Sequence, residues 1–149
     1  MHRKLFVSSL AFKNYSLDEI IHIIKENKLD GVDLAPLTIY KNWEQFENNL
    51  NYLKKKFNLH KIKINALQGI FFNKQIKLFY SSKKQLADLN KHLRKVILIS
   101  KKLKVKKIII GSSYFRKRGK LDFKKADIKF IKFFSNFKKI LKKKIYIFV

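Results

Sequence analysis

The residues best suited to chemistry lie together in the loop of residues 111–119, which follows the apolar run of residues 108–110. This loop contains the hydroxyl of Ser112 and the guanidinium groups of Arg116 and Arg118. Such groups at the carboxyl end of a buried strand are suited to bind the oxygens of a phosphate. The sequence therefore predicts an anion-binding loop. The alternative is a basic loop that is only solvated, in a chain rich in lysine.

Two further polar residues lie at the ends of short β-rich segments. Asp33 is near the carboxyl end of residues 31–34, and Gln68 directly follows residues 62–67. Because α/β proteins bind ligands at the carboxyl ends of parallel strands, both residues are candidates for substrate binding. The amide of Gln68 can donate and accept hydrogen bonds with a sugar hydroxyl. The alternatives are a charge satisfied at the strand end for Asp33 and an amide facing water for Gln68.

Other kinds of site find no support in the sequence. The absence of cysteine excludes disulfides, thiolate chemistry and cysteine-based zinc sites. No HExxH, GxGxxG, GxxxxGK[ST] or GxSxG pattern is present, which argues against zinc, nucleotide and hydrolase sites of those types. We expect the histidines to lie on the surface or on helix faces; they are His2, His22, His60 and His92.

The segments that position these residues alternate between β-rich runs and helical periods. The expected strands are residues 4–10, 31–34, 62–67, 106–110 and 145–149. Apolar spacing of three and four predicts helices over residues 17–27, 43–57, 83–103 and 128–141. Capping boxes open the first and third helices, at Ser16–Glu19 and Ser82–Gln85. This alternation indicates an α/β protein with a parallel sheet and right-handed crossovers.

Two architectures fit this order of segments. A (β/α)8 TIM barrel needs ~250 residues, so this chain would supply a partial barrel of about the first four βα units plus a fifth strand. The alternative is an open five-stranded parallel doubly wound sheet, which would normally end with a helix over its last strand. In either case we expect one domain over residues 1–149.

The composition is strongly basic, with a formal net charge of +26 and 36 lysine and arginine residues. Such a charge favours nucleic acid or anionic membranes. The lysines are spread along nearly the whole chain, however, and Ile, Asn and Phe are also abundant, as codon bias in an A/T-rich gene would produce. No apolar run approaches the ~18 residues that span a bilayer, and no signal-peptide pattern is present. We therefore expect a cytoplasmic protein without membrane contact.

The order of segments resembles the amino-terminal half of the xylose isomerase-like TIM barrels, in particular the sugar phosphate isomerase/epimerase branch. The matching segments are FVSSLAF, SLDEIIHIIKENKLDGVDLAP, ALQGIFFNKQIKLF and SSKKQLADLNKHLRKVILISKKLKVKKIIIGSSYFRKRG. That family commonly has a Gln after the third strand and a Gly-Ser followed by an Arg-containing loop after the fourth. It often has a Glu in the area of Asp33. The resemblance thus implies a TIM-barrel fold. It also implies substrate-binding roles for Asp33, Gln68, Ser112, Arg116 and Arg118.

The same resemblance implies a missing catalytic half. Active relatives bind a divalent metal such as Mn²⁺ or Mg²⁺ through Glu, Asp, His and Glu at the ends of the fifth to eighth strands. A carboxylate there moves a proton next to a sugar carbonyl. Where the first glutamate would stand, this chain has Phe148 and Val149. The resemblance therefore implies a truncated sugar phosphate isomerase/epimerase homologue, inactive alone and without a cofactor of its own.

Several partners are compatible with such a half. A companion half would restore a site for a sugar or sugar phosphate, and a homodimer would cover the open strand edges. A basic nucleic-acid-associated protein related to the apurinic-site endonucleases is the second alternative, with binding that does not depend on sequence. Those endonucleases use zinc-binding histidines, to which His22 and His92 on helices do not correspond.

Overall fold

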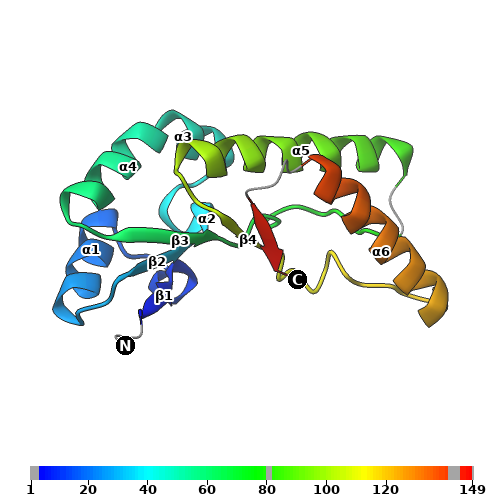
Figure 1. The fold of residues 1–149 in the computed structure, drawn as a ribbon, viewed down its shortest axis with the longest axis horizontal. Helices are drawn as coiled ribbons and strands as arrows, with labels where there is room; N and C mark the ends of the chain where they lie inside the picture. The colour runs from blue at the N-terminus through cyan, green and yellow to red at the C-terminus, as the bar shows by residue number, and fades with distance from the viewer. Residues whose placement is uncertain (1–3, 80–81, 141–144, 149) are drawn as a thin grey trace.

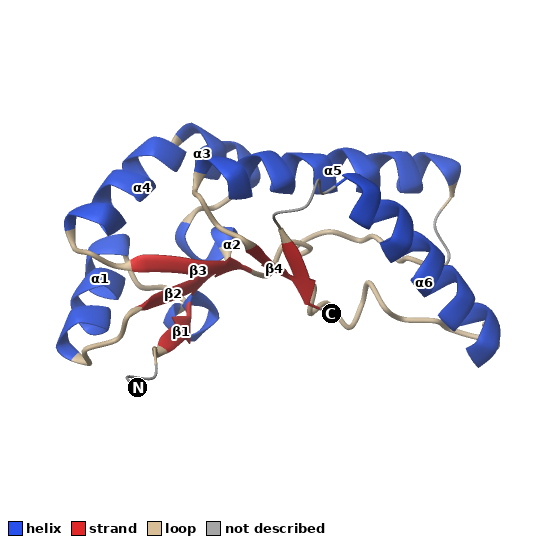
Figure 2. Cartoon of the chain, viewed as in Figure 1, coloured by secondary structure: helices blue, strands red, loops and turns tan. Residues whose placement is uncertain are grey.

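The computed structural model describes residues 4–79, 82–140 and 145–148 and forms a five-stranded parallel sheet with helices along one side (Figures 1 and 2). The strands are β1 (Phe6–Ser8), β2 (Gly31–Leu34), β3 (Lys63–Leu67), β4 (Lys107–Ile109) and β5 (Tyr146–Phe148). The helices are α1 (Leu17–Glu26), α2 (Pro36–Ile39), α3 (Trp43–Asn48), α4 (Leu50–Leu59), α5 (Lys83–Lys102) and α6 (Phe123–Ile140). A short 3-10 helix, η1, covers Ser9–Phe12.

The strand order is sequential, β1-β2-β3-β4-β5, and every neighbouring pair is parallel. Helices α1, α4, α5 and α6 follow one another around the outside of this sheet (Figure 1). A doubly wound sheet would instead reverse its strand order at a switch point and place helices on both faces. The architecture is therefore that of a partial (β/α)8 barrel, and the doubly wound alternative is wrong.

The two faces of the sheet differ in chemistry. Val32 and Leu34 of β2 and Ile108 of β4 are fully buried and belong to one apolar core with the outer helices. The residue between the two buried positions of β2, Asp33, points to the other face, because side chains alternate along a strand. We call this second face the inner face of the sheet. It bears the polar residues described below.

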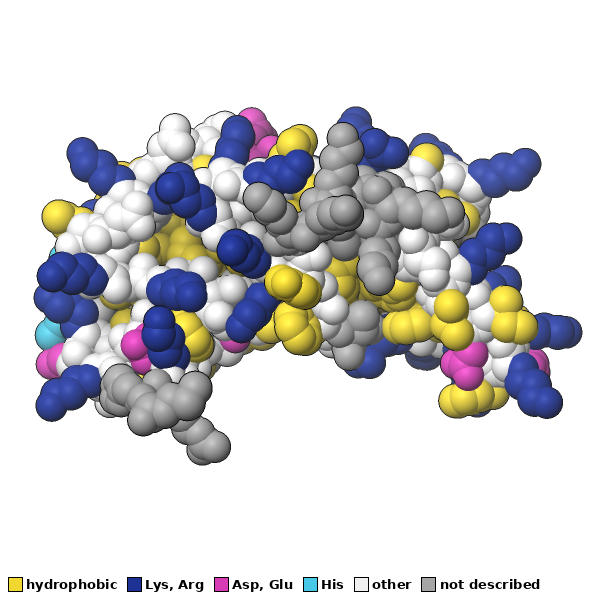
Figure 3. Space-filling view, viewed as in Figure 1, with side chains coloured by type: hydrophobic (Ala, Val, Ile, Leu, Met, Phe, Trp, Pro, Cys, Tyr) yellow, Lys and Arg dark blue, Asp and Glu magenta, His cyan; other side chains and the backbone are white. Residues whose placement is uncertain are grey.

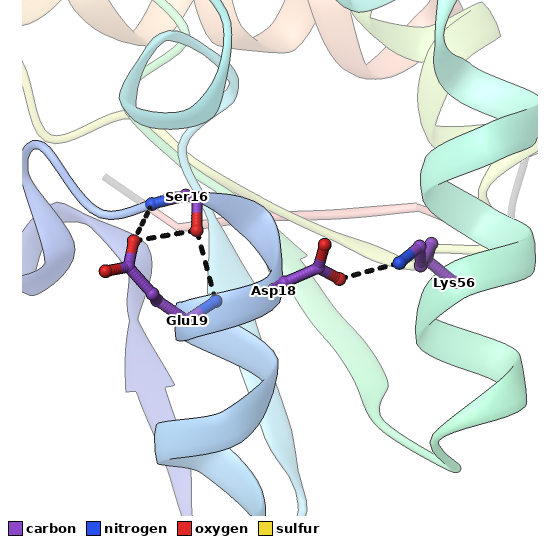
Figure 4. A network of polar contacts seen from close by, with 4 residues as sticks. All are labelled: Ser16, Asp18, Glu19 and Lys56. Atoms are coloured by element: carbon purple, nitrogen blue, oxygen red, sulfur yellow. Dashed lines mark hydrogen bonds and ion pairs between the residues drawn. The ribbon is translucent and has the colours of Figure 1, made fainter.

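Local caps form as the sequence predicts (Figure 4). The Ser16 hydroxyl accepts from the backbone N–H of Glu19, and the Glu19 carboxylate accepts from the Ser16 backbone N–H at 2.7 Å. The Ser16 hydroxyl also donates to the Glu19 carboxylate at 2.7 Å, and this bond, together with the one from the Ser16 backbone N–H, lowers the pKa of Glu19. In the same region Lys56 of α4 donates to Asp18 of α1 at 2.6 Å, joining the two helices. The second predicted box, Ser82–Gln85, opens α5.

Some predicted boundaries are wrong for local reasons. The first strand ends at Ser8, not residue 10, because the Ser8 hydroxyl accepts from the Leu10 N–H and starts η1. The single helix expected over residues 43–57 is two helices that meet at Asn49, where φ is −102°. Helix α2 was not expected at all, although Pro36 is well placed at its first turn.

The last βα unit also departs from the apolar pattern. Helix α6 buries Ala126 and Phe137, whereas the Ile128 and Ile131 that marked it in the sequence are 65% and 63% exposed. Leu141 and Val149 lie outside the described residues. No helix in the described part of the chain is long and apolar enough to cross a membrane.

Three turns from helix to strand share one unusual geometry. A lysine takes the left-handed conformation after α1, α4 and α5; these are Lys28, Lys61 and Lys104, with φ of 51°, 58° and 59°. In each turn the next residue is apolar and its N–H donates back to the last helical turn, as in Ile62 to Phe57 O at 2.9 Å. This is the helix-ending motif in which glycine normally occupies the left-handed position.

Candidate substrate-binding site

A cavity of about 740 Å³ lies at the carboxyl edge of the sheet, between the loops that follow β3 and β4. Residues 68–75 and 111–114 form most of its wall, completed by Leu10 and Ile109. Its volume is within the range of small-molecule sites. The sequence-predicted candidates Gln68 and Ser112 both line it, on opposite loops.

Gln68 is held in one orientation. Its Nε2 lies 2.5 Å from Ser8 Oγ and 2.7 Å from the backbone oxygen of Asp33. A backbone carbonyl only accepts hydrogen bonds, so the atom beside it must be the amide nitrogen. Both amide hydrogens are thereby used within the protein. Gln68 Oε1 accepts no hydrogen bond from the residues that the structure describes, and it belongs to a side chain of the cavity wall, so it is suited to accept from a ligand hydroxyl.

Asp33 lies on the inner face, outside the cavity lining. Its Oδ1 accepts from Asn65 Nδ2 at 2.7 Å, and Asn65 Oδ1 accepts from Lys107 Nζ at 3.1 Å. One amide thus joins a carboxylate and an ammonium group across three strands. Asn65 and Lys107 are not among the residues predicted from the sequence, although both are polar residues within apolar strand segments. The predicted substrate contact of Asp33 stays a prediction.

The three groups of the predicted anion site are not brought together. Ser112 reaches the cavity, and its Oγ accepts from the Phe115 N–H at 3.2 Å. Arg116 and Arg118 are exposed and do not line the cavity. The Arg118 guanidinium donates to Leu121 O at 2.6 Å and lies 5.7 Å from the ring centre of Phe123. The basic residue in the cavity wall is instead Lys74.

A buried histidine supports the β3 loop. His92 of α5 is 8% exposed, and its Nε2 lies 2.7 Å from the backbone oxygen of Ile70. Since that oxygen accepts, Nε2 carries the proton. Trp43 packs edge-on against the imidazole, with ring centres 4.8 Å apart. Burial lowers the pKa of His92. His92 thus lies on a helix face, as expected, but this face is buried because the tertiary fold brings the loop over α5.

The residues present do not fit a catalytic divalent metal. In the described ranges, no three His, Asp or Glu side chains converge as metal ligands must. The lining of the cavity contains no carboxylate and no imidazole.

Comparison with known proteins places the fold. No family model matches the sequence, and no curated protein matches it. Among solved structures, the chain is similar to the IolI protein with a binding zinc atom (TM-score 0.73, 14% identity), of which it covers 50% with 97% of its own length. It is also similar to the 3-keto-D-glucoside 4-epimerase YcjR of E. coli (TM-score 0.70, 13% identity, 98% of this chain and 56% of that one). A third similar structure is a D-psicose 3-epimerase (TM-score 0.68, 11% identity, 97% of this chain and 51% of that one).

These similarities define a class of fold. The chain spans about half the length of the solved structures it matches, and that half consists of consecutive βα units of a TIM barrel. More particularly, the fold is a partial TIM barrel similar to about half of the barrels of sugar epimerases and of a xylose isomerase domain protein.

Proposed function

We propose that this chain provides the sugar-binding loops of an isomerase or epimerase site of the xylose isomerase-like type. The observation that carries the proposal is the orientation of Gln68: its two amide hydrogens are occupied, and within the described part of the chain nothing donates to its Oε1, which can accept from a ligand hydroxyl. The similarity to epimerases, with identities of only 11–13%, supports the fold and not the substrate.

The proposed role is binding without turnover by this chain alone. Isomerisation next to a carbonyl needs a group that takes and returns a proton, commonly a carboxylate or imidazole. Among the residues that line the cavity there is neither. Asp33, on the inner face, is already paired with Asn65. A companion half or a second copy at the β5 edge, where Tyr146 and Phe148 are 64% and 50% exposed, would have to supply the chemistry.

Two measurements test the proposal. Titration of D-fructose into the protein, followed by NMR, should show binding that Gln68→Leu weakens by about tenfold, because one hydrogen bond to the ligand is lost. The exposed Asn51→Leu on α4 is the matched control and should bind as the wild type. If Gln68→Leu leaves the affinity for D-fructose unchanged, the role of Gln68 in sugar binding is overturned.

Turnover is assayed separately. The purified chain should show no isomerisation of ketose or aldose phosphates with Mn²⁺, Mg²⁺ or Co²⁺. Metal-dependent turnover that persists through repeated purification would overturn the proposal that this chain binds a sugar without converting it.

A second candidate function is non-specific binding of nucleic acid. It is favoured by the net charge of +26 and by the spread of lysine and arginine over the face of the molecule shown in Figure 3. Among the described residues, the lysines that form ion pairs with carboxylates are Lys56, which pairs with Asp18, and Lys95, which pairs with Glu47. Most of the positive charge is therefore available to phosphates.

A further inference from the structure

Two large aromatic side chains stand at the cavity wall with much of their surface in solvent. Phe72, in the loop after β3, is 49% exposed, and Tyr114, in the loop after β4, is 43% exposed. Burying an aromatic ring is strongly favourable. Two such rings left exposed on facing loops of one cavity indicate a surface that a ligand covers.

Both rings are carried by loops whose neighbouring residues are firmly packed. Phe71 and Phe115, the neighbours of Phe72 and Tyr114 in the sequence, are buried and stacked on each other with ring centres 4.5 Å apart. The Leu78 N–H also donates to Phe115 O at 3.0 Å, which ties the two loops together. The exposed rings therefore lie on preorganised backbone and cost little to order when a ligand binds.

Phe72 also belongs to a second hollow. Residues 72–74 line both the main cavity and a neighbouring hollow of about 530 Å³. Around Phe72 this hollow presents the polar side chains of Lys41, Asn42 and Glu44. An aromatic ring surrounded by hydrogen-bonding groups suits a sugar ring, whose C–H face is apolar and whose rim bears hydroxyls.

We propose that the site takes a glycoside with two sugar rings, one in the cavity beside Gln68 and the second stacked on Phe72. This inference rests on the proposed sugar-binding function and deepens it. Phe72 is then the residue that selects a two-ring ligand over a monosaccharide. Tyr114, with Lys77 Nζ 5.1 Å from its ring centre, forms the facing wall.

The test compares D-glucose with cellobiose and maltose, titrated separately into the full chain by NMR or calorimetry. We expect at least one disaccharide to bind roughly tenfold more tightly than glucose, as one aromatic stacking contact would provide. Phe72→Ala should remove this preference, because it weakens binding of the disaccharide more than binding of glucose. Tyr52→Ala is the matched control, because Tyr52 is a 51% exposed aromatic on α4 with Lys56 near its ring. It should preserve the preference.

The outcomes separate this inference from the function on which it rests. Equal affinities for all three sugars, with binding still weakened by Gln68→Leu, would overturn the two-ring ligand and keep the sugar site. A disaccharide preference that Phe72→Ala removes, with affinities for all three sugars that Gln68→Leu leaves unchanged, would keep the Phe72 contact and overturn the role of Gln68. No binding of any of the three sugars would overturn the inference.

Discussion

Phe71 and Phe115 stack with their ring planes only 16° apart and their centres at 4.5 Å, and this contact joins the two loops that form the cavity. Both side chains are buried, at 4% and 0% exposure. The pair therefore couples the stability of the partial barrel to the shape of its candidate site.

Truncating this stack should be costly. We expect Phe115→Ala to lower the free energy of unfolding by about 3–5 kcal/mol, since it opens a cavity between the loops. Urea unfolding followed by circular dichroism measures the change. Phe123→Ala, at a 64% exposed phenylalanine on α6, should change stability by only a few tenths of a kcal/mol. Equal losses in the two variants would show that the stack does not stabilise the fold.

The left-handed lysines offer a stabilising substitution. Lys61→Gly should raise the free energy of unfolding by about 1 kcal/mol, because glycine takes a φ of +58° without the strain of a Cβ. The same change at Lys55, in the exposed interior of α4, should lower stability by about 1 kcal/mol. Thermal denaturation of the two variants tests the opposite signs. A destabilised Lys61→Gly protein would mean that the lysine side chain contributes more than the backbone strain costs.

Gly31 is required by close packing of backbone. A Cβ at this position would lie 1.9 Å from the carbonyl oxygen of Lys63 on β3, so β2 and β3 would have to separate. We expect Gly31→Ala to cost about 3 kcal/mol or more. At Gly111 a Cβ would meet no atom within 4 Å, and Gly111→Ala should be nearly neutral. Amide hydrogen exchange of β2 and β3 would detect loss of their pairing, and unchanged protection in Gly31→Ala would contradict the prediction.

His92 makes stability depend on pH. Its pKa is lowered first by burial and further by Lys74 and Lys95, while the bond to Ile70 O and the charge of Glu47 oppose the shift. The unfolded chain protonates this histidine near pH 6.5, whereas the folded chain resists until a lower pH. Between these pKa values the unfolded state binds more protons, so stability falls as pH drops below about 6.5 and levels off below the folded pKa.

Urea unfolding across this range, compared between wild type and His92→Gln, measures the effect. The variant should lose this part of the pH dependence. His22→Gln, at a 70% exposed histidine on α1, should retain it. A wild-type profile in His92→Gln would assign the pH dependence to other groups.

Polyanion binding should be steep in salt and indifferent to sequence. Lysines contact phosphates as point charges, and binding releases counterions from the nucleic acid. The free energy gained from this release shrinks as the salt concentration rises. We expect affinity for labelled single-stranded DNA to fall by about a hundredfold or more between ~50 and ~200 mM salt. Two oligonucleotides of unrelated sequence should bind alike. A marked preference for one of them, or for an abasic site, would point to a built recognition surface.

Local sequence rules determined much of the framework. The capping boxes at Ser16 and Ser82 placed the starts of α1 and α5, because a cap depends only on residues three positions apart. The alternation of segments predicted the parallel sheet, and with it the position of Gln68 at the carboxyl edge. The resemblance to one half of a xylose isomerase-like barrel agrees with the solved structures that share this fold.

Only the tertiary structure decided what the site residues do. The orientation of the Gln68 amide depends on Ser8 and on the carbonyl of Asp33, which are 60 and 35 residues away. The pairing of Asp33 with Asn65 depends on a register shift between β2 and β3. Arg116 and Arg118 follow the predicted strand as expected, yet the backbone of their loop carries them away from the cavity. Sequence spacing specifies which edge of the sheet a residue reaches, but the direction of its side chain is set by contacts between segments that are distant in the chain.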